Sequence, residues 1–265
     1  MSDQAGLLAL TVTSLLIGFQ AGGLVDRVAV RLPPALERAW RAREAVLTPG
    51  PIASAACGAH SARHPSLDDA SAGCGPARAD GTPRRLGSAA LRPLGVRLLC
   101  GGAFGVLSVR FGFAPTLAAA MGATAILIVL ALIDHRHHLL PDVLTYPLLG
   151  FGLLINSAGT FVPLDEAILG AGLGYGGLWT FGWVYRALFR RRGIGPGDLK
   201  LLAALGAWLG WRALLPITQI AALIALVAIV TATLRCRRLP RMMPYGTYLA
   251  GAGWIVLVWS AGAAR

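Results

Sequence analysis

The sequence predicts an all-α membrane protein that crosses the bilayer about eight times, with a small loop domain between its first two helices. Of its 265 residues, 55% are hydrophobic and only 14% are charged, and the mean hydropathy is +0.64. Soluble domains carry about 25% charged residues, and about 20 consecutive apolar residues are enough to cross a bilayer. Several uncharged runs in this chain reach that length, which favours a polytopic membrane protein over a soluble one.

Eight candidate spans follow one another along the chain. Six are long uncharged runs, at residues 4–25, 111–133, 143–164, 167–185, 213–234 and 242–264. Two are weaker: 91–109 has arginines at its start, and 199–211 is short. A cleaved signal peptide is the alternative for the first run, but no basic segment precedes it.

The positions of the basic residues support the count of eight. With the N-terminus outside, the inner loops or their flanks hold 21 of the 24 lysines and arginines. The inner loops are then residues 26–90, 134–142, 186–200 and 235–241. Such an excess is typical of cytoplasmic loops. We therefore assign the net charge of +12 to membrane orientation and not to nucleic-acid binding.

The chain divides into three parts on this interpretation. Residues 1–25 form the first transmembrane helix, 26–90 a cytoplasmic loop domain, and 91–265 the main transmembrane domain. Within the loop domain we expect a short helix at about 34–47 and irregular structure at 48–83. The four cysteines of the chain do not make a disulfide framework.

A glycine-rich run at residues 170–177 lies inside one of the spans. Small residues allow membrane helices to approach closely, so we expect a helix–helix contact here. A nucleotide-binding glycine loop would need a strand before it and a helix after it, and neither is expected.

Two acidic residues, Asp134 and Asp198, stand where apolar spans meet water. A carboxylate at this depth is either solvated, paired with an arginine, or functional. Asp198 follows Gly195 and Gly197, which would let the backbone bend and approach a substrate closely. Lys200, two residues further on, would not face Asp198 on a regular helix and is left for another role. We predict that the two aspartates meet in space and form a catalytic pair.

Two adjacent carboxylates cannot both ionise easily, so they share a proton and titrate as a unit. The charged member can take a proton from water while the neutral member hydrogen-bonds a scissile carbonyl, which is the chemistry of an aspartic protease. The alternatives are a transporter or proton-coupled channel, whose carboxylates lie near mid-span, and a non-enzymatic assembly factor.

Other polar residues near Asp134 have simpler explanations. Asp142 follows a proline at the start of a span, where it would cap the helix; direct catalysis is the alternative. His135, His137 and His138 could suggest a metal, but adjacent histidines diverge on a helix, so we expect a basic cluster at the membrane surface.

Three segments resemble the prepilin peptidases, also called type IV leader peptidases, which are GxGD-type intramembrane aspartic proteases. The segment ending at Asp134, with residues 139–145, resembles the first catalytic block. Residues 193–208, containing Gly-Pro-Gly-Asp-Leu-Lys, resemble the second. Pro-Tyr-Gly at 244–246 resembles the last-span motif, with Tyr245 and Thr247 where phenylalanine and proline are usual.

The resemblance implies that this chain is a bacterial inner-membrane protein whose site faces the cytoplasm. It implies cleavage of the basic leader of type IV prepilins or type II secretion pseudopilins after a glycine. It also implies, for long-form members, methylation of the new N-terminus with S-adenosylmethionine. Substrates of this family carry a glutamate shortly after the cut. A cation such as Lys200 or a loop arginine is the partner that we expect for it.

The first loop departs from the family pattern. Long-form members carry two Cys-x-x-Cys pairs there, a set suited to tetrahedral zinc. This chain has instead the residues Cys57, His60, His64 and Cys74. A zinc site and a degenerate loop without metal are both open, and we favour the second. Asp26 also stands where the family has asparagine.

Overall fold

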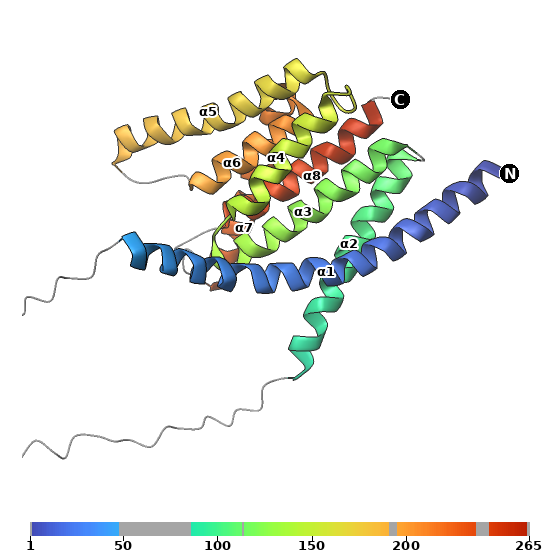
Figure 1. Cartoon of the computed structure of the whole chain (residues 1–265), viewed down its shortest axis with the longest axis horizontal. Coiled ribbons are helices and arrows are strands. Elements are labelled where there is room, and N and C mark those ends of the chain that lie inside the picture. The colour runs from blue at the N-terminus through green and yellow to red at the C-terminus, as the bar shows by residue number, and fades with distance from the viewer. Residues whose placement is uncertain (1, 48–85, 113, 191–194, 237–243, 264–265) are drawn as a thin grey trace, which may run out of the picture.

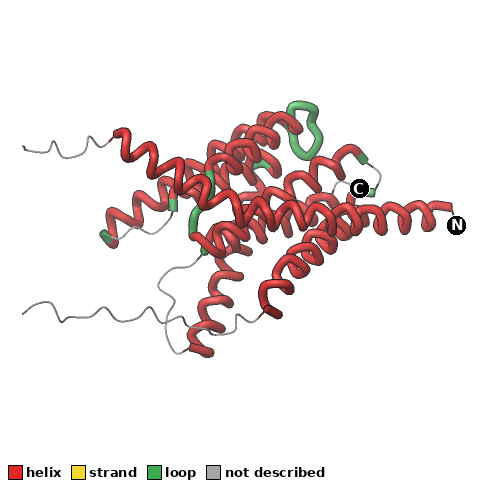
Figure 2. Tube along the Cα trace, turned by 60° about the horizontal axis from the view of Figure 1, so that its bottom comes forward, coloured by secondary structure: helices red, strands yellow, loops and turns green. Residues whose placement is uncertain are grey.

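The computed structural model describes residues 2–47, 86–112, 114–190, 195–236 and 244–263. All regular secondary structure in these ranges is helical, and no strand occurs in them (Figures 1 and 2). The predicted all-α class is therefore confirmed for the described part of the chain.

Helix α1 (Ser2–Leu47) crosses helix α2 (Leu86–Phe111), and the crossing depends on glycine (Figure 1). A Cβ atom at Gly18 would lie 2.7 Å from the carbonyl oxygen of Cys100, and one at Gly22 would lie 2.5 Å from Cα of Arg97. Backbones that approach this closely leave no room for a side chain at either position.

Helix α1 is longer than the sequence suggested. We expected a transmembrane helix ending near residue 25, but α1 continues without a break to Leu47. Val25 and Ala29 belong to one buried cluster with Val96 and Cys100 of α2. This i,i+4 apolar spacing supports the helix past the charged residues at 26 and 27. The helix expected at 34–47 is the end of α1, and residues 48–85 lie outside the described part.

The other helices form one packed group, drawn above α1 in Figure 1, with α5 at the edge far from α1. In chain order they are α3 (Pro115–His137), α4 (Asp142–Asn156), α5 (Leu164–Phe189), α6 (Pro196–Leu209), the 3-10 turn η1 (Trp211–Ala213), α7 (Leu214–Cys236) and α8 (Tyr245–Ala263). Their positions agree with the predicted spans, but α4 ends eight residues earlier than 164, at Asn156.

Helix α6 lies at the centre of this group and contacts α4, α5, α7 and α8. Every residue from Leu201 to Leu209 is buried, as expected for a helix that is apolar on all sides. It begins after Gly195, with Pro196 in the first turn where its missing N–H costs nothing. It ends at Gly210, whose φ of 77° suits glycine.

Two buried polar side chains fix α6 against α4. The Asn156 amide nitrogen donates to the carbonyl oxygens of Ala207 (2.8 Å) and Trp208 (3.1 Å), and its oxygen accepts from the backbone of the following loop. The Trp208 indole N–H donates to the Leu148 carbonyl at 2.7 Å. Because buried polar groups are costly unless paired, these bonds set the register of the two helices.

Four helical segments in the described residues are long and apolar enough to cross a membrane, judged by length and composition. They are Gly6–Pro33, Pro93–Phe111, Pro115–His137 and Trp211–Leu234. Large apolar side chains on α5 are also exposed, among them Trp179, Phe181 and Trp183. An exposed apolar surface of this kind is suited to lipid.

The glycine run on α5 makes the close helix contact that the sequence predicted. The positions of Gly170 and Gly206 face one another so tightly that a Cβ on either would overlap the other's backbone. A Cβ on Gly174 would lie 2.7 Å from the carbonyl oxygen of Leu202. Gly172 and Gly176 face open space, so only one side of the run serves this contact.

The contact between α5 and α6 can be tested with one large side chain. Gly206→Leu should lower the free energy of unfolding by about 3 kcal/mol, because the added atoms meet backbone that cannot turn away. Thermal unfolding in detergent measures the change. Gly176→Leu is the control and should leave stability nearly unchanged. Equal losses in the two variants would contradict the predicted contact.

Candidate active site

Four helix ends that are distant in sequence meet at one place. They are the C-terminal end of α3 and the N-terminal ends of α4, α6 and α8. Leu140, just before α4, lies between the other ends. A Cβ on Gly197 of α6 would lie 2.9 Å from the Leu140 Cβ, and one on Gly246 of α8 would lie 2.7 Å from the Leu140 Cδ1. Asp134 and Asp198 come from two of these ends.

Asp134 lies in the last turn of α3 and is only 3% exposed. Its carboxylate oxygen Oδ2 accepts hydrogen bonds from Thr247 of α8, from the backbone N–H at 2.6 Å and from the hydroxyl at 3.0 Å. Gly246 makes this approach feasible, because a Cβ there would lie 3.0 Å from both Cγ and Oδ2 of Asp134. The carboxylate is thus held by the first turn of a helix far away in sequence.

Asp198 lies in the first turn of α6 and is 8% exposed. Its carboxyl group accepts a hydrogen bond from the backbone of Gly195, and it is close enough to Asp134 for the two groups to interact electrostatically. Tyr245 of α8 also interacts electrostatically with Asp198. The aspartates that the sequence analysis paired are therefore neighbours in the fold.

Gly195 and Gly197 act differently from our expectation. The backbone at Gly195 is extended, with φ −73° and ψ 144°, which any residue can adopt. Neither glycine has a positive φ. Space excludes a side chain only at Gly197, where a Cβ would press on Leu140. A Cβ on Gly195 would lie 3.4 Å from the Asp198 Oδ2, which is an ordinary contact. Gly197 thus allows close packing beside Asp198.

Asp142 does not cap α4, so that prediction is wrong. The capping position belongs to Pro141, no side chain caps the helix, and Asp142 is the first helical residue. Its carboxylate binds Lys200 of α6 through both oxygens, at 2.6 and 2.7 Å. The Lys200 ammonium also lies 5.2 Å from the ring centroid of Tyr146. Lys200, for which we expected a substrate glutamate as a partner, thus ties the first turns of α4 and α6 together.

The histidines after Asp134 are exposed, as expected for residues at a membrane surface. His138 ends α3 with a left-handed backbone, and its N–H donates to the Asp134 carbonyl at 2.8 Å. Next to them, Arg136 pairs with Asp26 of α1 at 3.8 Å, which links α1 to this end of α3. No group of His, Cys, Asp or Glu in the described ranges could hold a metal ion.

The residues proposed for zinc, Cys57, His60, His64 and Cys74, lie outside the described residues. S-adenosylmethionine would need polar groups for its adenine, ribose and charged ends. Two cavities between the described helices are lined mainly by apolar side chains. They do not fit that molecule, so no step of the chemistry is derived through it.

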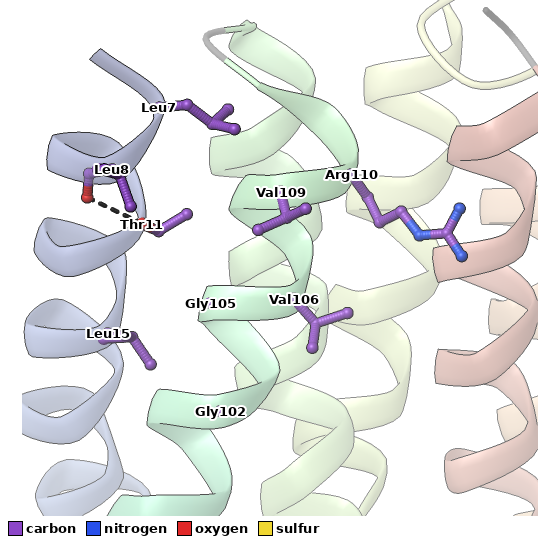
Figure 3. A pocket seen from close by; sticks show the side chains of 9 residues that line it. All are labelled: Leu7, Leu8, Thr11, Leu15, Gly102, Gly105, Val106, Val109 and Arg110. Carbon is purple, nitrogen blue, oxygen red and sulfur yellow. Dashed lines mark hydrogen bonds between the residues drawn. The ribbon is translucent and has the colours of Figure 1, made fainter. Parts of the chain in front are cut away.

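One of these cavities, of about 620 Å³, runs between α2, α3 and α8 and reaches Thr247 and His135 beside the aspartates. The other, of about 530 Å³, lies between the start of α1 and the end of α2. Leucines of α1 and valines of α2 line it, and Arg110 points away from α1 (Figure 3). Because Asp134 lies at the opposite end of the α2–α3 hairpin, the second cavity is not part of the site.

Thr247 is the site residue to which the sequence analysis gave no role. It was noted only as a departure from a motif, although it directly contacts Asp134. The sequence signal for this role was a hydroxyl residue in the first turn of an apolar helix, shortly after a proline. The N–H groups of a first turn lack partners within their own helix, so they seek an acceptor nearby.

Residues 121–230 match the type IV leader peptidase family. Over most of its length the chain is similar to proteins named prepilin leader peptidase/N-methyltransferase. The protein of Stutzerimonas stutzeri is 36% identical, with 95% of this chain and 91% of the relative covered. That of Burkholderia pseudomallei is 39% identical, with 91% and 82% covered. That of Pseudomonas aeruginosa is 35% identical, with 95% and 91% covered. No solved structure matches the chain.

Proposed function

We propose that this chain, which belongs to the type IV leader peptidase family, is a membrane aspartic endopeptidase. It removes the leader of type IV prepilins and pseudopilins. The observation that carries this proposal is the pair of buried carboxylates, Asp134 and Asp198, close enough to interact electrostatically. The names of the relatives supply the substrate class. Cleavage after a glycine follows from the same family assignment.

The chemistry uses one proton shared by the two carboxylates. The ionised member takes a proton from water as the water oxygen attacks the scissile carbonyl carbon, and the protonated member hydrogen-bonds the carbonyl oxygen. Burial supports this scheme, because two nearby carboxylates shielded from water cannot both remain charged. A transporter would place its carboxylates near mid-span, whereas these lie in the terminal turns of α3 and α6.

The neighbouring residues support the pair without touching the reacting bond. Gly197 lets Leu140 pack closely against the first turn of α6, which carries Asp198. The ion pair of Lys200 with Asp142 fixes the first turn of α6, on which Asp198 stands. Because both oxygens of Asp142 already accept from its ammonium, Lys200 would meet a substrate glutamate only by sharing that ammonium with Asp142.

We propose that the chain lies in the bacterial inner membrane, crosses it eight times, and has the aspartate pair at the cytoplasmic face. The four long apolar segments support a membrane location. The distribution of arginine supports the orientation, since 21 of the 24 basic residues fall on the side assigned to the cytoplasm. The segment 26–90 then belongs to the cytoplasmic side.

We further propose that the chain methylates the new N-terminus, using S-adenosylmethionine. The combined name of the relatives, which align with nearly the whole chain, supports this second activity. S-adenosylmethionine would supply the methyl group. Proteolysis by two carboxylates needs no metal, and a zinc site at Cys57, His60, His64 and Cys74 stays an untested alternative to a metal-free loop.

Replacing either catalytic carboxylate tests the peptidase. Asp134→Asn and Asp198→Asn keep the shape of the side chain but remove proton exchange, so each should slow prepilin processing by about 100-fold or more. Gel mobility of the pilin in cells measures cleavage. Asp165→Asn, an exposed carboxylate at the start of α5, is the control and should process normally. Normal processing by either active-site variant would refute the assignment.

Labelling tests the orientation. In a variant without the four native cysteines, Ser157→Cys should react with a membrane-impermeant maleimide from the periplasmic side of spheroplasts. His137→Cys should react only after the membrane is opened, since basic loops stay in the cytoplasm. Both positions are exposed in the fold. The reverse pattern would contradict the proposed orientation.

Mass spectrometry of mature pilin tests the methylation. Pilin processed by this enzyme, in cells without another prepilin peptidase, should carry one added methyl group on its first residue. Pilin that is cleaved but unmethylated would contradict the proposed methyltransferase activity without affecting the proposed peptidase activity. Purified enzyme without S-adenosylmethionine is the control and should cleave without methylating.

A further inference from the structure

Among the described residues, Thr247 alone donates hydrogen bonds to the Asp134 carboxylate, and both bonds end on the same oxygen. The Thr247 N–H lies 2.6 Å from Oδ2 and its hydroxyl oxygen lies 3.0 Å away. The short N–H contact is typical of a hydrogen bond to a charged acceptor. Among the described residues, no such bond is made to the other oxygen, Oδ1.

The place of Thr247 in its helix strengthens this interaction. It lies in the first turn of α8, which begins at Tyr245. Its N–H makes only a longer contact, 3.2 Å, to the carbonyl of Pro244. The N-terminal end of a helix carries partial positive charge, which favours an anion beside it. Asp134 itself stands near the C-terminal end of α3, where an anion is unfavourable, and α8 offsets that disadvantage.

The Thr247 hydroxyl has a second acceptor, the Ala131 carbonyl oxygen at 3.1 Å. A hydroxyl carries one hydrogen, so it donates to one of these acceptors at a time. An ionised carboxylate is the stronger acceptor, so the hydroxyl turns to Asp134 when that group is charged. When Asp134 has taken up a proton, the hydroxyl can return to Ala131.

Asp198 is held differently. Its carboxyl group accepts one backbone hydrogen bond, from Gly195, and no side chain of the described residues donates a hydrogen bond to it. Asp198 also lies near a helix N-terminus, in the first turn of α6, so the helix ends do not distinguish the two groups. The donors do: Thr247 supplies two to Asp134, whereas one acts on Asp198. When two nearby carboxylates share a single proton, it stays on the member whose charge is less well stabilised.

We propose that Thr247 is a positioning residue that makes the aspartate pair asymmetric. Its two hydrogen bonds to Oδ2 of Asp134 keep that carboxylate ionised and leave Oδ1 to accept the proton of the attacking water. Asp198 is then the proton donor. This inference rests on the proposed peptidase function. It assigns a role to each carboxylate, which the pair alone does not.

The proton balance follows from this assignment. Water adds its oxygen to the scissile carbonyl carbon and gives a proton to Asp134 Oδ1, while Asp198 gives its proton to the carbonyl oxygen. In the second step Asp134 passes its proton to the amide nitrogen, the carbon–nitrogen bond breaks, and a hydroxyl of the intermediate returns a proton to Asp198. The pair ends in its starting state, and the products are an acid and an amine.

Two pairs of variants that differ mainly at one hydroxyl test this inference. In purified protein with a prepilin peptide, Thr247→Val should lower kcat by about 10- to 100-fold relative to the native enzyme, because a hydrogen bond to a charged group is lost. The kcat of Thr247→Ala should be lower than that of Thr247→Ser by the same factor. KM should change by less than about threefold, because binding is not affected.

The control is Thr218→Val, which removes a partly buried hydroxyl from α7, far from the aspartates, and should leave kcat unchanged. Thr247→Ser keeps both donors and should stay within about threefold of the native kcat. The Ala and Ser comparison remains valid if the valine variant unfolds in detergent.

Two results would overturn the inference: a Thr247→Val enzyme with the native kcat, or serine and alanine variants that are equally impaired. Asp134→Asn in the same assay separates this failure from a failure of the function. If Asp134→Asn is inactive and Thr247→Val is normal, only the role of Thr247 is wrong. If Asp134→Asn cleaves at the native rate, the peptidase assignment itself falls.

Discussion

Two buried acidic groups that repel one another have to be held together, and the rest of the fold can be understood from this constraint. Asp134 and Asp198 gain nothing from each other when both are charged. What keeps them in place is their attachment to rigid helix ends and the donors that those ends provide. Asp198 has the first turn of its own helix, whereas Asp134 depends on the first turn of α8. The site is thus a junction of helix termini more than a cluster of side chains.

The position of this junction depends on packing at the other end of the same helices. Helix α6 is buried along nearly all of its length. Asn156 and Trp208 lock its far end to α4, and Gly170 with Gly206 brings it against α5. At the near end, Lys200 and Asp142 join α6 to α4 again. A helix held at both ends cannot slide or rotate easily, so Asp198 stays at a fixed distance from α3 and α8.

Helix α8 contributes to the site through its first turn, which faces both carboxylates. Thr247 donates to Asp134, and Tyr245 interacts with Asp198. The absence of a side chain at Gly246 allows the turn to lie this close. The cavity between α2, α3 and α8 reaches the same turn, so the turn that orients the carboxylates also borders this cavity.

The sequence predicted the helical class, most helix positions, the closeness of Asp134 and Asp198, and the tight glycine contact of α5. These depend on local signals: apolar length, glycine spacing, and acidic residues at span ends. It did not determine that α1 continues past residue 25, that Asp142 binds Lys200 instead of capping α4, or that Thr247 donates to Asp134. Only the tertiary structure decided these, because each depends on which helix ends become neighbours, and that follows from packing between segments distant in sequence.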